Sequence, residues 1–270
     1  MAILPLSRRA LVLLGVATAS LLTGPMKPAI SASSETLRIA VEGEYPPFNK
    51  TDKKGQLSGF DIDIANALCK AIEASCKFVK QRWDRMIPDL VDGKYDLVVS
   101  SLSITPERLQ KIDFTLPYYN TPAKLVAKKG ASLSSTLDGL KGQRVGVQKA
   151  TTHELYLTRK LGSTVELVRY DTLPKAESDM LAGKVDFVFG DAMALSQGFL
   201  KTDKGKAFAF VGPDIRIGSG IGIGVRKGQP DLVANLNRAL SAIHSDGTYD
   251  KIAAKYFDFS LSEWQSADIQ

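Results

Sequence analysis

Two neighbouring stretches decide the fold: LRIAV at residues 37–41 and GFDIDIANALCKAIEA at residues 59–74. The first is a short aliphatic run, which is typical of a buried strand. In the second, apolar side chains recur three and four positions apart, which predicts an amphipathic helix. Further strands are expected over residues 78–79, 95–100, 144–147, 165–168 and 185–189, and further helices over residues 86–91, 152–161 and 173–182. This alternation favours an α/β protein with parallel sheets and helices on both faces.

Two segments are suited to connect one lobe with another. Residues 118–122 form an extended stretch that ends in proline, and Gly212-Pro213 with the spaced glycines at residues 218–224 forms the second. If the chain crosses there and back, lobe one is discontinuous, residues 36–119 plus 219–270, and lobe two is the insert at residues 123–213. A single doubly wound domain with a glycine-rich loop is the alternative. The glycines do not indicate a nucleotide site, because they alternate with isoleucine and valine as in a strand.

The first 32 residues have the three-part layout of a secretory signal peptide. Arg8 and Arg9 form a positive start, an uncharged apolar run follows over residues 10–24, and small residues then predict cleavage near Ala32. The run is short against the roughly 20 residues of a membrane span, although an uncleaved anchor is the alternative. The arginine pair partly matches a twin-arginine signal, so the export route stays open. The segment predicts a secreted, periplasmic protein.

Charge and composition argue against several classes of partner. The chain carries a net charge of +6, and removal of residues 1–32 leaves 32 basic against 29 acidic residues, a net charge of +3. This near balance, without a basic stripe interleaved with aromatics, argues against nucleic acid. The remaining chain is long enough for one large domain or two small ones.

Cys69 and Cys76 are the only cysteines. An exported chain meets an oxidising compartment, and a helix-to-strand turn between these residues would bring the sulfurs together, so we expect a disulfide. Two independent thiols are the alternative. No metal site is expected, because two cysteines are too few for a structural zinc and the only histidines are His153 and His244.

Three motifs resemble a known family. They are GFDIDIA at residues 59–65, SSLSIT at residues 100–105 with Arg108, and DGTYDK at residues 246–251. Together they resemble the polar amino acid solute-binding proteins of ABC importers, most of all the lysine/arginine/ornithine- and histidine-binding proteins. The likeness extends over about residues 37–259.

This resemblance implies the two-lobed type II periplasmic-binding-protein fold, in which two α/β lobes joined by two hinge strands close on a ligand. It also implies a monomer that is not an enzyme, holds no cofactor, and delivers a cationic amino acid to the membrane permease of an ABC importer. The spacing of Cys69 and Cys76 fits the same subfamily, where the pair is a disulfide.

The charges of a free amino acid must each be met, since an unpaired charge in a closed cleft is costly. Arg108 matches the family's carboxylate ligand, because its planar fork can bond both oxygens, although a lone arginine is usually solvated. Thr152 would add donors to the same carboxylate and would also suit a helix N-cap. Asp191 follows a predicted strand and matches the family's ammonium-binding acid, with an N-cap as the alternative. Ser101 and Ser103 would supply further oxygens.

The expected side-chain pocket combines aromatic faces with an acid. Tyr45 and Trp83 match the positions that sandwich the ligand side chain in the basic amino acid binders, where flat rings attract a cation. Glu42 matches an acid that faces the ligand's distal charge, and Ser100 is a further acceptor. The structural alternatives are a rigid turn with core aromatics for residues 45–48 and an ordinary helix start for Trp83.

Four departures from that subfamily bear on the ligand. Glu42 stands where the lysine/arginine/ornithine binder has the shorter Asp, and Trp83 stands where it has Phe. Residues 151–153 read Thr-Thr-His in place of Ser-Thr-Gln, and residues 148–149 read Gln-Lys in place of Leu-Gln. The longer acid and larger ring change the pocket depth, and the changes at 148 and 153 would widen the ligand range. A cationic amino acid is the prediction, and an opine or a broader polar amino acid is the alternative.

Two functions of other classes compete with this interpretation. A few relatives on this fold are dehydratases, and Glu42 is the candidate general acid of a cyclohexadienyl dehydratase-like enzyme. A sensor module of a membrane receptor would need a downstream membrane span, which the sequence as far as Gln270 does not contain. The full set of groups that match amino acid capture favours binding.

Overall fold

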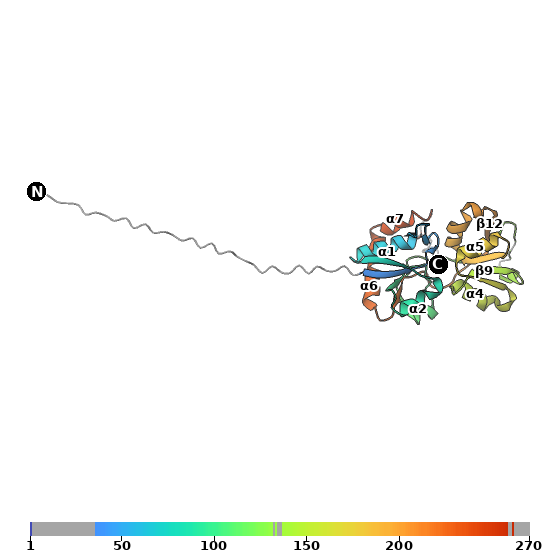
Figure 1. The fold of residues 1–270 in the computed structure, drawn as a ribbon, viewed down its shortest axis with the longest axis horizontal. Coiled ribbons are helices and arrows are strands. Elements are labelled where there is room, and N and C mark those ends of the chain that lie inside the picture. Colours follow the sequence, from blue (N-terminus) through green and yellow to red (C-terminus); the bar gives the residue numbers. More distant parts are fainter. Residues whose placement is uncertain (2–35, 132, 134–136, 259–260, 262–270) are drawn as a thin grey trace. The chain divides into compact units, whose positions relative to one another are not determined.

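The computed structural model describes Met1 and residues 36–131, 133, 137–258 and 261. In this part of the chain two five-stranded sheets form, together with a small three-stranded one. Helices surround each of the larger sheets (Figure 1), which confirms the predicted α/β class. The sheets are mixed rather than parallel as predicted, because the strands Gly224–Arg226 and Ala123–Lys128 run antiparallel to their neighbours. The predicted signal peptide lies outside the described residues, apart from Met1. No helix that the structure describes combines the length and apolarity needed to cross a membrane.

Lobe one, as the term is used below, is the first five-stranded sheet with its helices. Its strands in spatial order are β5 (Ser75–Lys80), β1 (Thr36–Val41), β6 (Leu97–Val98), β13 (Gly224–Arg226) and β7 (Ile112–Phe114). β1 runs parallel to β5 and β6, whereas β13 runs antiparallel to both of its neighbours. Its helices are α1 (Phe60–Ala71), α2 (Met86–Val91), α3 (Pro106–Leu109), α6 (Pro230–Ser245) and α7 (Thr248–Ala253). The small sheet of β2 (Glu44–Tyr45), β3 (Asn49–Thr51) and β4 (Leu57–Ser58) and the 3₁₀ turn η1 (Trp83–Arg85) complete it.

Lobe two is the second five-stranded sheet with its helices. Its strands in spatial order are β10 (Glu166–Tyr170), β9 (Arg144–Gln148), β11 (Phe187–Asp191), β8 (Ala123–Lys128) and β12 (Phe208–Ile215). β9 runs parallel to β10 and β11, and β8 runs antiparallel to β11 and β12. The helices are α4 (Thr152–Leu161), α5 (Leu173–Leu181) and the π-helix η4 (Ala194–Leu200), and the 3₁₀ turns are η2 (Leu137–Leu140), η3 (Gly162–Thr164) and η5 (Asp203–Ala207).

Local sequence explains where the elements that carry the site begin. α1 starts after Gly59, whose φ is +130°, and a Cβ there would lie 2.3 Å from the carbonyl oxygen of Phe48. Only glycine allows that close approach. α3 starts at Pro106, with Thr105 accepting a hydrogen bond from the backbone N–H of Arg108.

The chain passes between the two sheets twice. All strands of lobe one come from residues 36–114 and 224–226, and all strands of lobe two from residues 123–215. The two connecting segments meet at an antiparallel bridge between Tyr119 and Ile221. We therefore propose the discontinuous division expected from the sequence, with lobe two extended past Pro213 to Ile215, where β12 ends.

The glycine-rich segment is less strand-like than the sequence predicts. Only Gly224–Arg226 forms a strand, and Ile221 makes isolated bridges. Gly218 and Gly220 have φ angles of +81° and +94°, so the backbone is turned away from an extended conformation there. A Cβ on Gly218 would also lie 2.7 Å from the carbonyl oxygen of Ile104. The glycines thus serve close packing of this crossing against lobe one.

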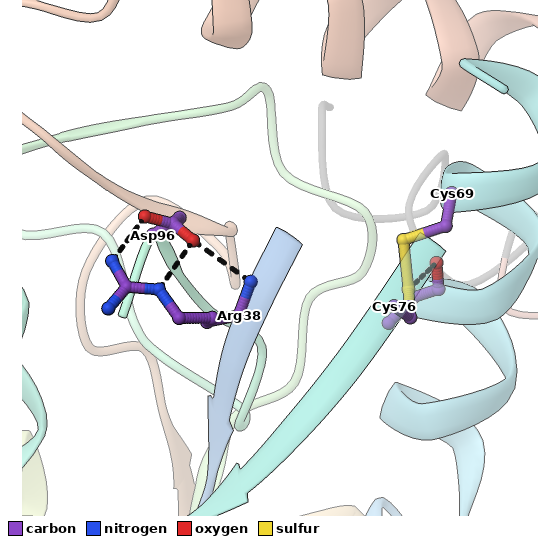
Figure 2. The surroundings of a disulfide bond; sticks show 5 residues. Arg38, Cys69, Cys76 and Asp96 are labelled. Carbon is purple, nitrogen blue, oxygen red and sulfur yellow. Dashed lines mark hydrogen bonds and ion pairs between the residues drawn. A yellow bond between two sulfur atoms is a disulfide. The ribbon is translucent and has the colours of Figure 1, made fainter. Parts of the chain in front are cut away.

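The predicted disulfide is present. Cys69 near the end of α1 is bonded to Cys76 at the start of β5, with an S–S distance of 2.02 Å (Figure 2). Figure 2 also shows Arg38 of β1, whose guanidinium and backbone N–H both donate to the carboxylate of Asp96. This pair fixes the start of β1 against the segment that leads into β6.

Candidate functional site

A small cavity of about 20 Å³ lies between the two lobes. Seven of the nine residues predicted to bind ligand line it, and three further residues do so as well. The predicted ones are Glu42, Tyr45, Trp83, Ser100, Ser101, Ser103 and Thr152, and the others are Gln148, Thr151 and His153. Glu42 follows the end of β1, and Gln148 ends β9. Both therefore occupy the carboxyl edge of a sheet, where open α/β folds place ligand groups.

Glu42 is the acid of this cavity and is only 4 % exposed. Burial raises the pKa of its carboxyl group to about 8, against the lowering effect of a hydrogen bond from Gln148. The Gln148 Nε2 atom donates to Glu42 Oε1 over 2.5 Å, and it reaches across from the other lobe. Gln148 is the one donor to this carboxylate within the described part of the chain. A cation in the cavity would therefore find an acid with free acceptor capacity.

The aromatic walls come from two segments of lobe one. The ring of Tyr45 stacks at 6.2 Å on Phe48, which belongs to the core. Tyr45 therefore packs against a core aromatic and also lines the cavity. Trp83 begins η1 and is half-buried. Its indole N–H donates to the backbone oxygen of Ala150 in lobe two over 3.0 Å. Trp83 thus forms a wall of the cavity and also contacts the opposite lobe.

Arg108 lies beside the cavity and is not among its lining residues. One guanidinium nitrogen donates to the carbonyl oxygen of Ser103 over 2.9 Å, and the group lies 5.5 Å from the centre of the Trp83 ring. Burial lowers the pKa of this guanidinium to about 10, yet it stays cationic at neutral pH. It forms no ion pair with any residue that the structure describes. The unpaired, half-buried cation is a suitable partner for a carboxylate.

Asp191 also lies outside the lining of the cavity. It ends β11, is 4 % exposed, and accepts the backbone N–H of Ala194, the first residue of η4, over 2.9 Å, although the N-cap residue of η4 is Met193 rather than Asp191. Burial raises the pKa of its carboxyl group to about 7. Tyr45 lies against its backbone. Asp191 therefore lies behind Tyr45, which lines the cavity, and its carboxylate can still accept hydrogen bonds from an ammonium group.

The hydroxyl side chains at the site make one contact between the lobes and two hydrogen bonds within lobe one. Ser103 Oγ lies 3.4 Å from Thr152 Oγ1 of the other lobe. Ser100 Oγ accepts the backbone N–H of Glu42 over 3.0 Å. Ser101 Oγ donates to the buried carboxylate of Asp61, which comes from the GFDIDIA motif and anchors this loop.

The structure corrects the predicted cap of α4. The cap is Thr151, which accepts the backbone N–H of Glu154, and Thr152 is the first helical residue. Thr152 has no capping bond to make, which leaves its hydroxyl for the cavity. Its hydroxyl at the helix start is suited to an anion, because the N–H groups of a first helical turn lack intrahelical partners.

Sequence reasoning treated Gln148, Thr151 and His153 as departures from the family rather than as lining residues. The edge rule that selected Asp191 applies equally to Gln148, because it ends a parallel strand. His153 packs edge-on against Phe189 at 5.6 Å, and burial followed by the nearby Arg108 charge lowers its pKa to about 4. It is therefore neutral at physiological pH. Among the described residues no cluster of potential metal ligands occurs.

Comparison with known proteins places this fold and site in a family. Residues 37–259 match bacterial extracellular solute-binding proteins, family 3, and the chain belongs to that family. The curated relatives that it resembles are solute-binding proteins and not enzymes, and the chain is a solute-binding protein.

The L-arginine-binding protein of Pseudomonas aeruginosa is 43 % identical over 93 % of this chain and 97 % of its own. The lysine/arginine/ornithine-binding periplasmic protein of Escherichia coli is 42 % identical over 90 % of this chain and 96 % of its own. Among solved structures, an ancestral arginine-binding protein bound to arginine superimposes with a TM-score of 0.77 at 36 % identity, covering 82 % of this chain and 98 % of the other.

Proposed function

We propose that this protein captures a cationic amino acid, arginine in particular, between its two lobes in the periplasm and delivers it to the permease of an ABC importer. One observation carries the proposal: the buried Glu42 carboxylate faces the cavity that Tyr45 and Trp83 line. An acid that is 4 % exposed and has a single hydrogen-bond donor is stable as an anion only when a cation joins it. The names of the relatives support the same ligand class.

The two backbone charges of an amino acid have candidate partners on opposite lobes. Arg108 of lobe one offers a planar guanidinium without an ion-pair partner among the described residues, and it suits the α-carboxylate. Thr152 at the start of α4 adds a hydroxyl to the same group. Asp191 of lobe two suits the α-ammonium. A free amino acid would thus bind to both lobes at once.

The distal end of the ligand would then reach Glu42. Flat faces of Tyr45 and Trp83 favour a planar cation through cation–π attraction, worth about 0.5–2 kcal/mol. The side-chain oxygen of Gln148 is a second acceptor beside Glu42, because its nitrogen already donates to that acid. Two acceptors next to flat walls match the several coplanar N–H groups of a guanidinium better than one ammonium.

Titration calorimetry on the purified mature protein tests the proposal. Arginine, lysine, ornithine and histidine are compared with citrulline, glutamine and an opine such as octopine at one pH and salt concentration. We expect arginine to bind most tightly and citrulline, which has the same length without the charge, to bind far more weakly. Equal affinity for citrulline, or binding of none of the cationic amino acids, would overturn the assignment. Tightest binding of the opine would favour the broader alternative.

The cellular part of the proposal has a separate test. Cell fractionation of the producing bacterium should place the protein in the periplasmic fraction. Deletion of its gene should reduce uptake of radiolabelled arginine, and expression of the wild-type gene should restore it. Recovery of the protein in the cytoplasmic fraction would contradict the periplasmic location and would leave the ligand assignment unaffected.

A further inference from the structure

The contact between Trp83 and Ala150 joins the lobes at the rim of the cavity. The indole Nε1–H of Trp83 donates to the carbonyl oxygen of Ala150 over 3.0 Å. Ala150 has a φ of +58°, a left-handed conformation that non-glycine residues rarely adopt. Strain of this kind persists only where surrounding contacts hold it in place.

Contacts on the lobe-two side hold that conformation. The backbone N–H of Ala150 donates to the carboxylate of Glu154 over 2.7 Å, while Thr151 Oγ1 accepts the backbone N–H of Glu154 over 3.1 Å. This reciprocal arrangement resembles a capping box, with the acid reaching back past the start of α4. With its N–H bound inside lobe two, Ala150 presents its carbonyl oxygen to lobe one. The residues that follow, Thr151 and Thr152, line the cavity.

A second contact joins the same two segments of the chain. Lys149 Nζ lies 3.5 Å from the carboxylate of Asp84, the residue after Trp83. Asp84 is held in turn by Arg82, at 2.7 Å. Residues 82–84 of lobe one therefore face residues 149–150 of lobe two with one hydrogen bond and one ion pair.

We propose that Trp83 is a positioning residue: its indole N–H holds the segment Lys149–Thr152 of lobe two over the occupied cavity and thereby slows ligand release. The proposal rests on the proposed function for the identity of the ligand. A phenylalanine at this position would supply a smaller aromatic wall and no donor. The loss of the hydrogen bond is therefore read from the separation of the lobes, which the size of the ring does not report.

Stopped-flow kinetics with arginine and lysine tests this role in Trp83→Phe. The bond is neutral and lies at the rim, so its loss should speed dissociation about two- to fivefold, which corresponds to about 0.5–1 kcal/mol. Association should be unchanged. The smaller ring also alters the aromatic wall, so the ratio of arginine to lysine affinity is expected to shift and does not test the bond. An unchanged dissociation rate would overturn the proposal.

Arg159→Gln is the matched control, since it removes another contact between the lobes. The Arg159–Glu107 ion pair spans 3.0 Å, and both side chains are more than half exposed. Exposed pairs of this kind contribute little. We expect a smaller change in the dissociation rate than in Trp83→Phe. A larger change would show that any link between the lobes has the effect and would reject a special role for the indole.

A distance measurement separates this proposal from the ligand assignment. Spin labels at Ser241→Cys on α6 and Lys160→Cys on α4, both exposed, report the separation of the lobes with saturating arginine and without it. With saturating arginine, Trp83→Phe should shift the distance distribution toward longer separations. An identical distribution would contradict the positioning role, whereas a failure of arginine to bind would contradict only the proposed function.

Discussion

Two acidic residues in and behind the cavity owe their chemistry to burial. Glu42 has a pKa of about 8 and Asp191 one of about 7, in both cases chiefly because burial disfavours the anion. Their folded-state pKa values lie above those of an unfolded chain. The folded state therefore binds these protons more tightly, and their contribution to the free energy of unfolding falls as pH rises from about 4.5 to 8.

Ligand binding should have the opposite pH dependence. A cationic ligand requires Glu42 and Asp191 to be ionised, so binding below their pKa values must release protons. We expect the affinity for arginine to rise about tenfold or more between pH 6 and pH 8. Calorimetry at pH 6.5 in two buffers of different ionisation enthalpy should detect the released protons. An affinity that is flat over this range would contradict the shifted pKa values.

Glu42→Gln tests the role of the distal acid. The amide keeps the size of the side chain and removes its negative charge, so arginine should bind tenfold or more weakly, about 1.4 kcal/mol. The gap between arginine and citrulline should narrow, because specificity here comes partly from rejecting a neutral side chain. The competing view, in which Glu42 plays no part in recognition, requires the same arginine-to-citrulline ratio in mutant and parent.

Arg108→Met and Asp191→Asn test the two backbone anchors. Each leaves one ligand charge unpaired in a closed site, a loss of roughly 3–5 kcal/mol in binding free energy. Asparagine retains an oxygen that can accept the backbone N–H of Ala194, so the fold should survive and thermal unfolding without ligand should change little. Near-normal affinity for arginine in either variant would remove that anchor from the site.

The sequence allowed prediction of residue types at this site better than of their exact partners. Matches to ligand-binding positions of the resembled subfamily selected Glu42, Tyr45 and Trp83, which the structure brings together around one cavity. Contacts between lobes could not be predicted in the same way, because the pairing of Gln148 with Glu42 joins residues 106 positions apart in the chain. The indole bond of Trp83 depends on a backbone angle at Ala150, which no side-chain pattern encodes.

Secondary-structure elements that depend on local sequence were also predicted better than those that depend on distant contacts. Periodicity over residues 59–74 located α1, whose helical part is Phe60–Ala71, since the pattern of a helix is local. The disulfide was predicted from the turn expected between the helix and the following strand and from the predicted signal peptide. The break in the glycine-rich segment was missed, because it arises from close packing of Gly218 against Ile104 rather than from the alternating sequence.

Removal of the disulfide should affect stability more than binding. The bond closes a short loop of seven positions between Cys69 and Cys76, and loss of such a cross-link costs about 2–3 kcal/mol in the chain-entropy account. Cys76 lies at the start of β5, at the opposite end of the strand from the carboxyl edge that carries the cavity. Urea unfolding of the Cys69→Ser/Cys76→Ser variant should show the loss, while its arginine affinity should stay within about twofold. A large loss of affinity would link the bond to the site.

At the scale of the whole molecule, the candidate ligand groups are divided between the lobes. Glu42, Tyr45, Trp83 and Arg108 belong to lobe one, and Thr152 and Asp191 belong to lobe two. A ligand that contacts both sets stabilises the closed arrangement over an open one by its differential affinity.

Solution scattering should therefore record a smaller radius of gyration with saturating arginine than without it. The lobes would rotate about the two connecting segments near Tyr119 and Ile221, which are joined by one antiparallel bridge between these residues. The Arg108→Met variant serves as the control and should show no change at the same arginine concentration. An unchanged radius in the parent protein would contradict hinge closure.

The central position of β13 has a consequence for the order in which the protein is made. This strand comes from residues 224–226, yet it lies between β6 and β7 in the first sheet. The ribosome completes every strand of lobe two before it reaches β13, so lobe two can assemble while the first sheet still lacks an inner strand. Until then β6 and β7 expose unpaired edges, which invite association with other chains. A nascent chain that stalls after Ile215 should therefore require chaperone protection, and this need should end once translation has passed Arg226.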